Sequence, residues 1–351
     1  MHAKRGEPTT PAWSSDQLDS ACPPEIEAPH FDALLGAWVL SQYSDVLAAF
    51  RSSSLIPISP HSKADSELPD ESSRLRMREE TRDALCPAQL RSWRDSIAPL
   101  VDSLADGLPT DQPVDLLTRY ARPSCLALAV MVTGIEPHDA ERLERIAEPI
   151  SAFAAEPYDQ VLRSRAKDAK MQLRSCFGPG PEFLRHSGFV ALAHTMPRLL
   201  ANAWFALLRH PQEWSMLHQE PGLTEQAIEE LLRYAGLPRI IFRKAIEDID
   251  LNGLRIRAGE RIVLRIIAAN RDPQRFANPD RVDLTRGGTG QLTLGAGTHS
   301  CIGASLIRMA AVTISRPLLE RFARINLSEP VQWHGGSGFR SPASLVVSLE
   351  R

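Results

Sequence analysis

The stretch "LGAGTHSCIG" (residues 294–303) places three glycines, one histidine and one cysteine within ten positions. A pattern with apolar residues at helical spacing, "IGASLIRMAAVTISRPLLERFAR" (302–324), follows it, so we expect Cys301 at a helix N-terminus. The unpaired N–H groups and the dipole there favour an anion, and a cysteine so placed tends toward the thiolate, the form that ligates metal. The three glycines would let a planar group lie close to the main chain.

Two interpretations of Cys301 follow from these residues. A haem held by a single axial thiolate fits them, because it needs one cysteine and space for a flat ring. The alternative is a buried free cysteine beside a glycine turn. The other cysteines are scattered and lack CxxC spacing, so we expect neither a disulfide framework nor a structural zinc site.

The composition bounds the class of protein. The chain has 351 residues, of which 43% are hydrophobic and 24% charged, with a net charge of −3. This balance is typical of a soluble globular protein and argues against a nucleic-acid partner. The N-terminus has no apolar signal region, and apolar runs such as "CLALAVMV" (125–132) are too short to span a bilayer. We therefore expect a cytoplasmic protein with no membrane partner.

Periodicity predicts a mainly α-helical chain with small β-sheets. Apolar residues recur at helical spacing in four further segments, which are residues 74–85, 90–108, 187–210 and 223–236. Residues 245–270 instead alternate around turns at Asn252-Gly253 and at 258–260, which predicts short hairpin strands, and residues 345–350 predict another strand. Pro317 is expected to kink or break the helix over 302–324.

The stretch at 294–303 resembles the haem-binding signature of the cytochrome P450 family, with Leu294 where a phenylalanine usually stands. Four further segments resemble other motifs of the family and stand in the proper order along the chain. They are "AWVLSQYSDVLAAF" (37–50), "EELLR" (229–233), "NPDRVDLTR" (278–286) and "FRSPASLVV" (339–347). The resemblance implies the cytochrome P450 fold: one haem-thiolate domain over residues 31–351, after a flexible segment at 1–30. The lid region between Gly134 and Ala191 and the N-terminus are shorter than is usual in the family.

The resemblance also implies roles for single residues around haem b (iron protoporphyrin IX). Cys301 would be the proximal iron ligand, flanked by Gly295 and Gly303. The two haem propionates need cationic donors, and the matching residues are Arg76, Arg243 and His299. For Arg76 and His299, the alternative is a solvated surface residue.

A second set of matching residues is structural. Glu230 and Arg233 correspond to the buried ion pair of the family, and Arg281 would complete a triad with them. Outside this context, Glu-x-x-Arg is usually a pair on a helix surface.

The oxygen-binding helix departs from the family pattern. Residues 191–195, "ALAHT", align with Ala-Gly-x-acid-Thr, so Thr195 is kept while His194 and Leu192 replace the acid and the glycine. His194 is open to three interpretations: a proton relay, a distal iron ligand or a packed side chain. Leu192 would narrow the oxygen side, and Pro197 is expected to kink the helix because it cannot donate to the carbonyl of residue 193.

Three functions fit these features. The first is a monooxygenase that acts on a small or carrier-bound secondary metabolite, with a ferredoxin or flavodoxin as electron donor. The second is a haem-thiolate enzyme without normal oxygen activation, which uses peroxide, isomerises or dehydrates. The third is a non-catalytic haem-binding or partner-recruiting protein. Arg74, Arg78 and Arg82 share one helix face, which either docks an acidic ferredoxin or is simply solvated.

Overall fold

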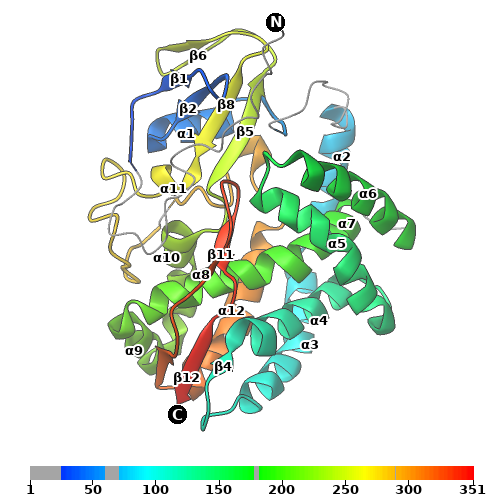
Figure 1. Ribbon diagram of the computed structural model, residues 1–351, viewed down its shortest axis with the longest axis vertical. Coiled ribbons are helices and arrows are strands. Elements are labelled where there is room, and N and C mark those ends of the chain that lie inside the picture. Colours follow the sequence, from blue (N-terminus) through cyan, green and yellow to red (C-terminus); the bar gives the residue numbers. More distant parts are fainter. Residues whose placement is uncertain (1–24, 60–70, 178–181, 289) are drawn as a thin grey trace, which may run out of the picture.

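The computed structural model describes residues 25–59, 71–177, 182–288 and 290–351, so most of the expected N-terminal segment lies outside it. Helices form the larger part of the molecule, and a sheet packs at one end of them (Figure 1). This confirms the prediction of a mainly α-helical fold with small sheets. Within the described ranges, no helix is long and apolar enough to cross a membrane.

The five segments with helical periodicity all contain helices, and the described chain has further helices outside them. The described helices are α1 (Tyr43–Arg51), α2 (Glu71–Ala84), α3 (Pro87–Asp106), α4 (Arg122–Thr133), α5 (Ala140–Ala155), α6 (Gln160–Cys176), α7 (Glu182–Val190), α8 (Met196–Leu208), α9 (Pro211–Gln219), α10 (Thr224–Ala235), α11 (Ile266–Ala269) and α12 (Ala304–Arg321). Helix α12 continues through Pro317, so the expected break is wrong. The strand expected to run to residue 270 ends earlier, because residues 266–269 form α11.

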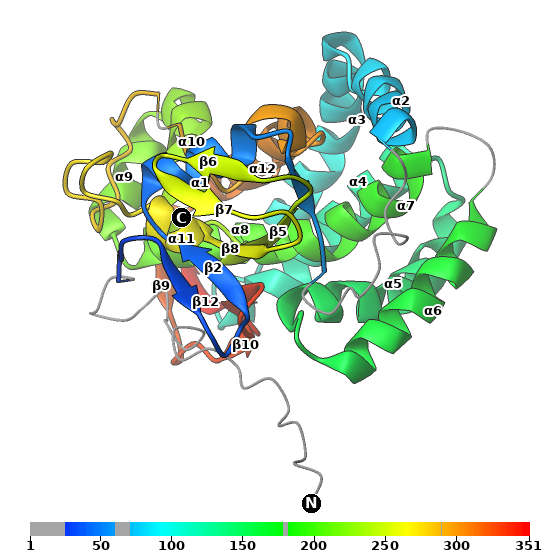
Figure 2. The ribbon, with the colours of Figure 1, turned by 90° about the horizontal axis from the view of Figure 1, so that it is seen from above.

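The main sheet joins the N-terminal part of the chain to the hairpin region. Its strand order is β1 (His30–Asp32), β2 (Ala37–Leu40), β8 (Arg261–Arg265), β5 (Ile240–Ala245) and β3 (Leu55–Pro57). Strand β2 pairs with β8 in parallel, whereas the other pairs are antiparallel. Seen from above, this sheet and the group of α5, α6 and α7 lie on different sides of the molecule (Figure 2).

Three smaller sheets complete the described part of the fold. They are β4 (Val114–Asp115) with β12 (Val346–Glu350) and β9 (Arg324–Leu327), β6 (Ile249–Leu251) with β7 (Leu254–Ile256), and β10 (Trp333–Gly335) with β11 (Arg340–Pro342). The β6–β7 turn is at Asn252 and Gly253, both with positive φ, as the Asn-Gly pair predicts. The hairpin thus accounts for the alternating sequence pattern around this turn.

The helix expected over residues 187–210 is interrupted by a wide turn. Residues Ala191–Thr195 form a π-helical turn between α7 and α8, in which the N–H of Met196 donates to the carbonyl of Ala191. Pro197 lies in the first turn of α8, where its missing N–H costs little. The wide turn lies directly on the N-terminal side of Pro197, and such turns often lie at functional sites.

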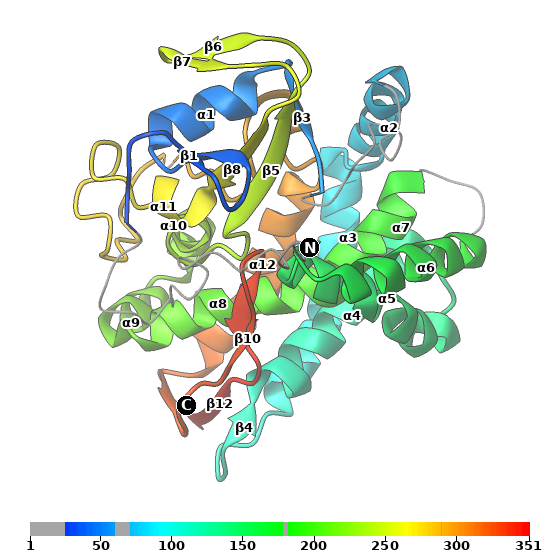
Figure 3. The ribbon, with the colours of Figure 1, turned by 45° about the horizontal axis from the view of Figure 1, so that its top comes forward.

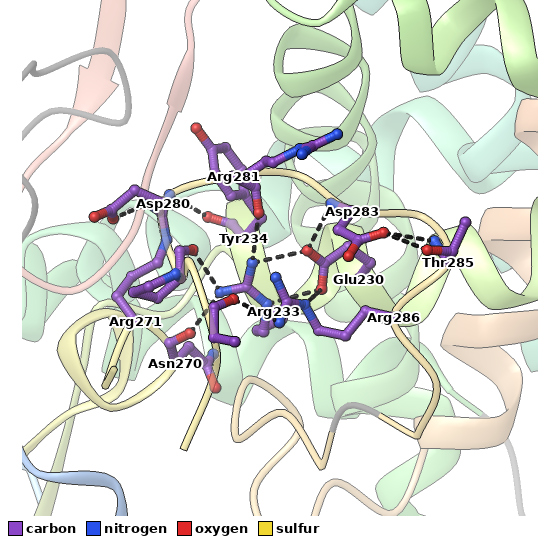
Figure 4. Close-up of polar contacts among 12 residues, drawn as sticks. Glu230, Arg233, Tyr234, Asn270, Arg271, Asp280, Arg281, Asp283, Thr285 and Arg286 are labelled. Carbon is purple, nitrogen blue, oxygen red and sulfur yellow. Dashed lines mark hydrogen bonds and ion pairs between the residues drawn. The ribbon is translucent and has the colours of Figure 1, made fainter. Parts of the chain in front are cut away.

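Glu230 and Arg233 form a fully buried ion pair on α10 (Figure 4). Both side chains have 0% exposure, and Nη2 of Arg233 lies 2.8 Å from Oε1 of Glu230. Arg233 also donates to the carbonyls of Asn270 and Pro279, at 2.8 Å each. The pair therefore fixes a loop that has no regular secondary structure to hold it.

Arg286, not Arg281, is the third charged member of this group. Nε of Arg286 lies 3.2 Å from Oε2 of Glu230. Arg281 is exposed and contributes only its backbone carbonyl, which accepts from Arg233 at 3.1 Å. In Figure 4 the side chain of Arg281 points away from Glu230. The expectation that Arg281 completes the triad is corrected, because the loop turns between the two arginines and brings the later one to the carboxylate.

We predict that Glu230→Gln lowers the free energy of unfolding by about 3–5 kcal/mol, because Arg233 would keep its buried charge without a countercharge. Arg286→Met is expected to lower it by about 1–3 kcal/mol, because it removes one partner of that carboxylate. The matched control, Arg281→Met, keeps the backbone carbonyl and is expected to change stability by less than about 0.5 kcal/mol. Urea unfolding followed by circular dichroism measures all three. A larger loss in the Arg281 variant than in the Arg286 variant would contradict this assignment.

Candidate functional site

The loop that presents Cys301 is a series of tight turns closed by backbone hydrogen bonds. The N–H of Cys301 donates to the carbonyl of Leu294 at 2.7 Å, and the N–H of Ser300 donates to that of Gly297 at 3.1 Å. Gly295 and Gly297 have φ of +70° and +64°, a backbone conformation that residues with a side chain rarely adopt. A Cβ on Gly297 would also lie 2.9 Å from the carbonyl oxygen of Phe50. These two glycines thus allow the turns and the close approach of α1.

Two polar residues that the sequence analysis missed tie this loop to the buried ion pair. Oδ1 of Asn270 accepts from the N–H of Leu292 at 2.7 Å, and its Nδ2 donates to the Thr293 hydroxyl at 2.9 Å. The Thr293 hydroxyl in turn donates to the carbonyl of Leu232 on α10 at 2.6 Å. The carbonyl of Asn270 is also an acceptor for Arg233. The Cys301 loop is therefore positioned by the same residues that enclose the ion pair.

Cys301 opens onto a cavity of about 610 Å³. Its lining is mostly apolar and is provided by α2, α7, the π turn, α8, the Cys301 loop and α12. Of the predicted site residues, it contains Cys301, Gly303, His299, Leu192 and Thr195. Among the described residues outside its immediate neighbours, only the Cys301 sulfur, at 3.9 Å, would lie within 4 Å of a Cβ on Gly303. The absence of that Cβ keeps space open beside the sulfur.

The electrostatic setting of Cys301 differs from the expectation at the start of a helix. Burial is the largest effect and raises the pKa of its thiol. The N–H of Gly303 and the nearby Arg78 and Arg308 lower this pKa, but less than burial raises it. Without a metal, the helix N-terminus therefore does not by itself make a thiolate here.

Of the two nearby arginines on α2, Arg78 faces the cavity and Arg76 does not line it. Both guanidinium Nη atoms of Arg78 donate to the carbonyl of Ser300 at 3.1 Å, and Arg78 lines the cavity. Arg76 is exposed and is not among the residues that line the cavity. The inward direction of Arg78 also removes it from the solvated face proposed for partner docking, whereas Arg82 is exposed. The side chain of Arg74 lies outside the described part of the chain.

Arg243 is a buried cation near the edge of the same cavity. It lies on β5 opposite Pro57, which lines the cavity, and is 3% exposed. In the described chain it donates only to the carbonyl of Phe242, and its Nε has no hydrogen-bond partner. Burial lowers its pKa to about 10. A guanidinium held this way can accept an anionic partner, because burial of an unpaired charge is unfavourable.

The π turn separates the two residues that were expected to act together. Thr195 and Leu192 line the cavity, whereas His194 does not. The ring of His194 is buried, and its Nε2 lies 2.9 Å from the carbonyl oxygen of Glu144 on α5. Because a carbonyl only accepts, Nε2 carries the proton. This geometry supports the interpretation of His194 as a packed side chain. It gives no support for His194 as an iron ligand or as a proton relay into the cavity.

The chain is similar to known proteins of one family. A family model described as "Cytochrome P450" matches residues 207–332. "Biotin biosynthesis cytochrome P450" of Bacillus subtilis (strain 168) is 30% identical over 298 residues, which are 76% of this chain and 75% of that protein. "Nocardicin C N-oxygenase" of Nocardia uniformis subsp. tsuyamanensis is 29% identical over 301 residues, which are 76% and 74% of the two chains.

A solved structure has the same fold. It is described as P450BioI in complex with an acyl carrier protein ligated to hexadec-9Z-enoic acid, and it superimposes with a TM-score of 0.83 at 24% identity. The superposition covers 92% of this chain and 94% of the other. The described helices and small sheets therefore form a known architecture.

We predict a pH dependence of stability from His194. Burial lowers its pKa below the usual 6.5, so between the folded pKa and 6.5 the unfolded chain binds a proton that the folded chain does not. Its contribution to stability is present above about pH 6.5 and is lost as the pH falls. His194→Gln retains a donor for Glu144 but does not titrate, so its unfolding midpoint is expected to fall less between pH 7.5 and 5.5 than that of the parent.

The control is His138→Gln, whose side chain is 79% exposed, and we expect it to keep the pH dependence of the parent. Urea unfolding at both pH values measures the difference. Equal pH dependence in the parent and in His194→Gln would show that the histidine is not buried as described.

Proposed function

The chain belongs to the cytochrome P450 family and is an oxidoreductase, and on this basis we propose that it is a monooxygenase of a small secondary metabolite, either free or bound to a carrier protein. The observation that carries the proposal is the exposure of the Cys301 thiol to an apolar cavity at the start of α12. The relatives named above include an N-oxygenase, which supports oxygen insertion as the class of reaction.

The residues of the site fit a haem cofactor, which the family implies; haem b is our assignment. Cys301 would ligate the iron, and the space beside Gly303 would receive the ring. Arg243, with its unpartnered Nε, is suited to one propionate. Arg78 and His299, which line the cavity near Cys301, are suited to the other. When bound, haem supplies the redox chemistry with dioxygen, and its thiolate ligand donates electron density to the iron.

The residues of this chain bind the substrate, enclose the site and deliver protons. Leu192 and the apolar lining exclude water from the space above Cys301, which strengthens polar interactions there. Thr195 carries a hydroxyl at the wall of the cavity and can hold a proton or pass it on. His194 does not take part in our scheme, because its ring binds the carbonyl of Glu144. The proton that Thr195 delivers therefore has to come from water or substrate.

One observation favours a second candidate, a haem-thiolate enzyme that uses peroxide. No carboxylate is among the described residues that line the first cavity, and Leu192 stands where the family has a glycine. Peroxide itself already carries the protons and electrons that the activation of oxygen would require. Product formation with NADPH, a reductase and a ferredoxin, compared with product formation from peroxide, distinguishes the two candidates.

The partners follow from this proposal. A monooxygenase needs an electron donor, for which we propose a ferredoxin or a flavodoxin. Of the three arginines expected to dock it, Arg82 is exposed in the described structure and Arg78 binds the Cys301 loop instead. A non-catalytic role gains no support from the site or the relatives, and a cytoplasmic location stays a prediction.

We predict that the reduced protein with carbon monoxide shows the absorption band of a thiolate-ligated haem and that Cys301→Ala abolishes it, because the mutant has no thiolate to bind the iron. The matched control is Cys86→Ala, which removes an exposed cysteine and is expected to keep the band. A retained band in Cys301→Ala would refute the ligand assignment, and with it the proposed function.

We also predict different effects of the two arginines on α2. Arg78→Ala is expected to release haem several-fold faster to apomyoglobin, because it removes a cation beside Cys301 and the donors to Ser300. Arg76→Ala, with the same charge change one half-turn away, is expected to release it at the parental rate. Faster loss from the Arg76 variant alone would restore the original assignment.

A further inference from the structure

A second cavity of about 410 Å³ adjoins the one at Cys301. It is enclosed mainly by α5, α6 and α7. Four residues line both cavities, namely Met77, Ser187, Ala191 and Thr195. Because haem would take up space in the first cavity, a substrate that reaches Thr195 is expected to extend into the second.

The lining of the second cavity combines apolar and cationic side chains. Ile150, Leu173, Val190 and Phe339 give it an apolar wall. Its ionisable members among the described residues are Lys170, Arg174 and His186, and none of the described lining residues is a carboxylate. The cations lie in a part of the molecule that the proposed haem contacts do not use.

The cationic side comes from α6. Helix α6 carries five Lys or Arg and one acidic residue, Asp168, although the whole chain has a net charge of −3. Lys170 and Arg174 are four residues apart, so their side chains emerge from the same face, about 6 Å apart at Cβ. Both are exposed, and both line the cavity. Figure 3 shows α6 at the outer flank of the molecule, next to α5.

A buried hydroxyl provides a further polar contact in this cavity. Ser151 on α5 is 1% exposed and lines the cavity. Its Oγ has no hydrogen-bond partner within the described chain. Buried polar groups are normally paired, so this hydroxyl is available to a polar atom of a ligand.

We propose that the second cavity binds the anionic end of an amphiphilic substrate. A carboxylate or phosphate pairs with Lys170 and Arg174, and the apolar part extends past Met77 and Thr195 toward Cys301. This inference rests on the proposed function and names its substrate class. The anion comes either from a free carboxylic acid or from the phosphodiester of a phosphopantetheine arm, which ligate the same two cations.

The test uses the haem-loaded protein and three probes, which are dodecanoate, dodecanol and S-dodecanoyl-4′-phosphopantetheine. Calorimetry and the spectral shift of the haem both measure binding. The parent is expected to bind at least one anionic probe about tenfold more tightly than dodecanol. A preference for dodecanoate identifies a free acid, and a preference for the thioester identifies a tethered substrate. Binding of neither anion more tightly than dodecanol overturns the proposal.

The double variant Lys170→Gln/Arg174→Gln is expected to lose about tenfold in affinity for the preferred anion and to bind dodecanol as the parent does. The matched control is Arg165→Gln/Lys167→Gln, which removes the same charge from α6 at positions that do not line the cavity. An equal loss in both variants, or an equal loss for dodecanol, overturns the proposal.

Failure here is distinct from failure of the proposed function. A protein that gives the thiolate-haem band with carbon monoxide but shows no preference for anions keeps the function and loses only this inference. The parental comparison of probes needs no variant, so it decides the question even where a variant does not fold.

Discussion

The site depends on the burial of one ion pair, Glu230 with Arg233. A carboxylate and a guanidinium at 0% exposure need all their hydrogen-bonding positions filled, because unpaired buried charge is very unfavourable. On α10 they fill only part of that requirement for each other. The carbonyls of Asn270, Pro279 and Arg281 accept from Arg233, and the N–H of Asp283 donates to Glu230, while Arg286 adds a second cation beside the carboxylate. The irregular chain after α11 therefore has to fold back onto α10. Since Asn270 also holds the loop before Cys301, the position of the thiol follows from the same requirement.

Local structure could be predicted from the sequence wherever a residue pattern is typical of a single conformation. The apolar spacing predicted α2, α3, α10, α12 and the segment of α7 and α8, but not the other helices. Asn252-Gly253 predicted a hairpin turn, and the glycines before Cys301 predicted a tight loop at a helix start. The sequence could not decide between arginines that lie close together in the chain. Arg76 and Arg78 are two positions apart, and which one faces the cavity depends on how α2 is rotated against the Cys301 loop. Arg281 and Arg286 were indistinguishable for a similar reason, because the path of the loop decides which one reaches Glu230.

The cavities themselves could not be predicted, since they depend on packing between elements far apart in the sequence. The second cavity exists because α5, α6 and α7 enclose a space that no motif describes. Its cations appear in the sequence as ordinary residues of a polar helix. Only their position at the wall of a cavity that shares Thr195 with the Cys301 site gives them a chemical role.

The π turn at 191–195 is equivalent to one extra residue in an otherwise continuous helix. Each residue of an α-helix advances by about 100°, so residues after the turn lie on faces about 100° away from those that an uninterrupted α-helical pattern in the sequence would predict. A deletion of one residue within the turn would restore regular winding and leave the faces of α7 and α8 where they are, because the wide turn absorbs the extra residue. For the same reason, an alignment of related chains that treats this segment as one regular helix would be wrong by one residue on one side of the turn.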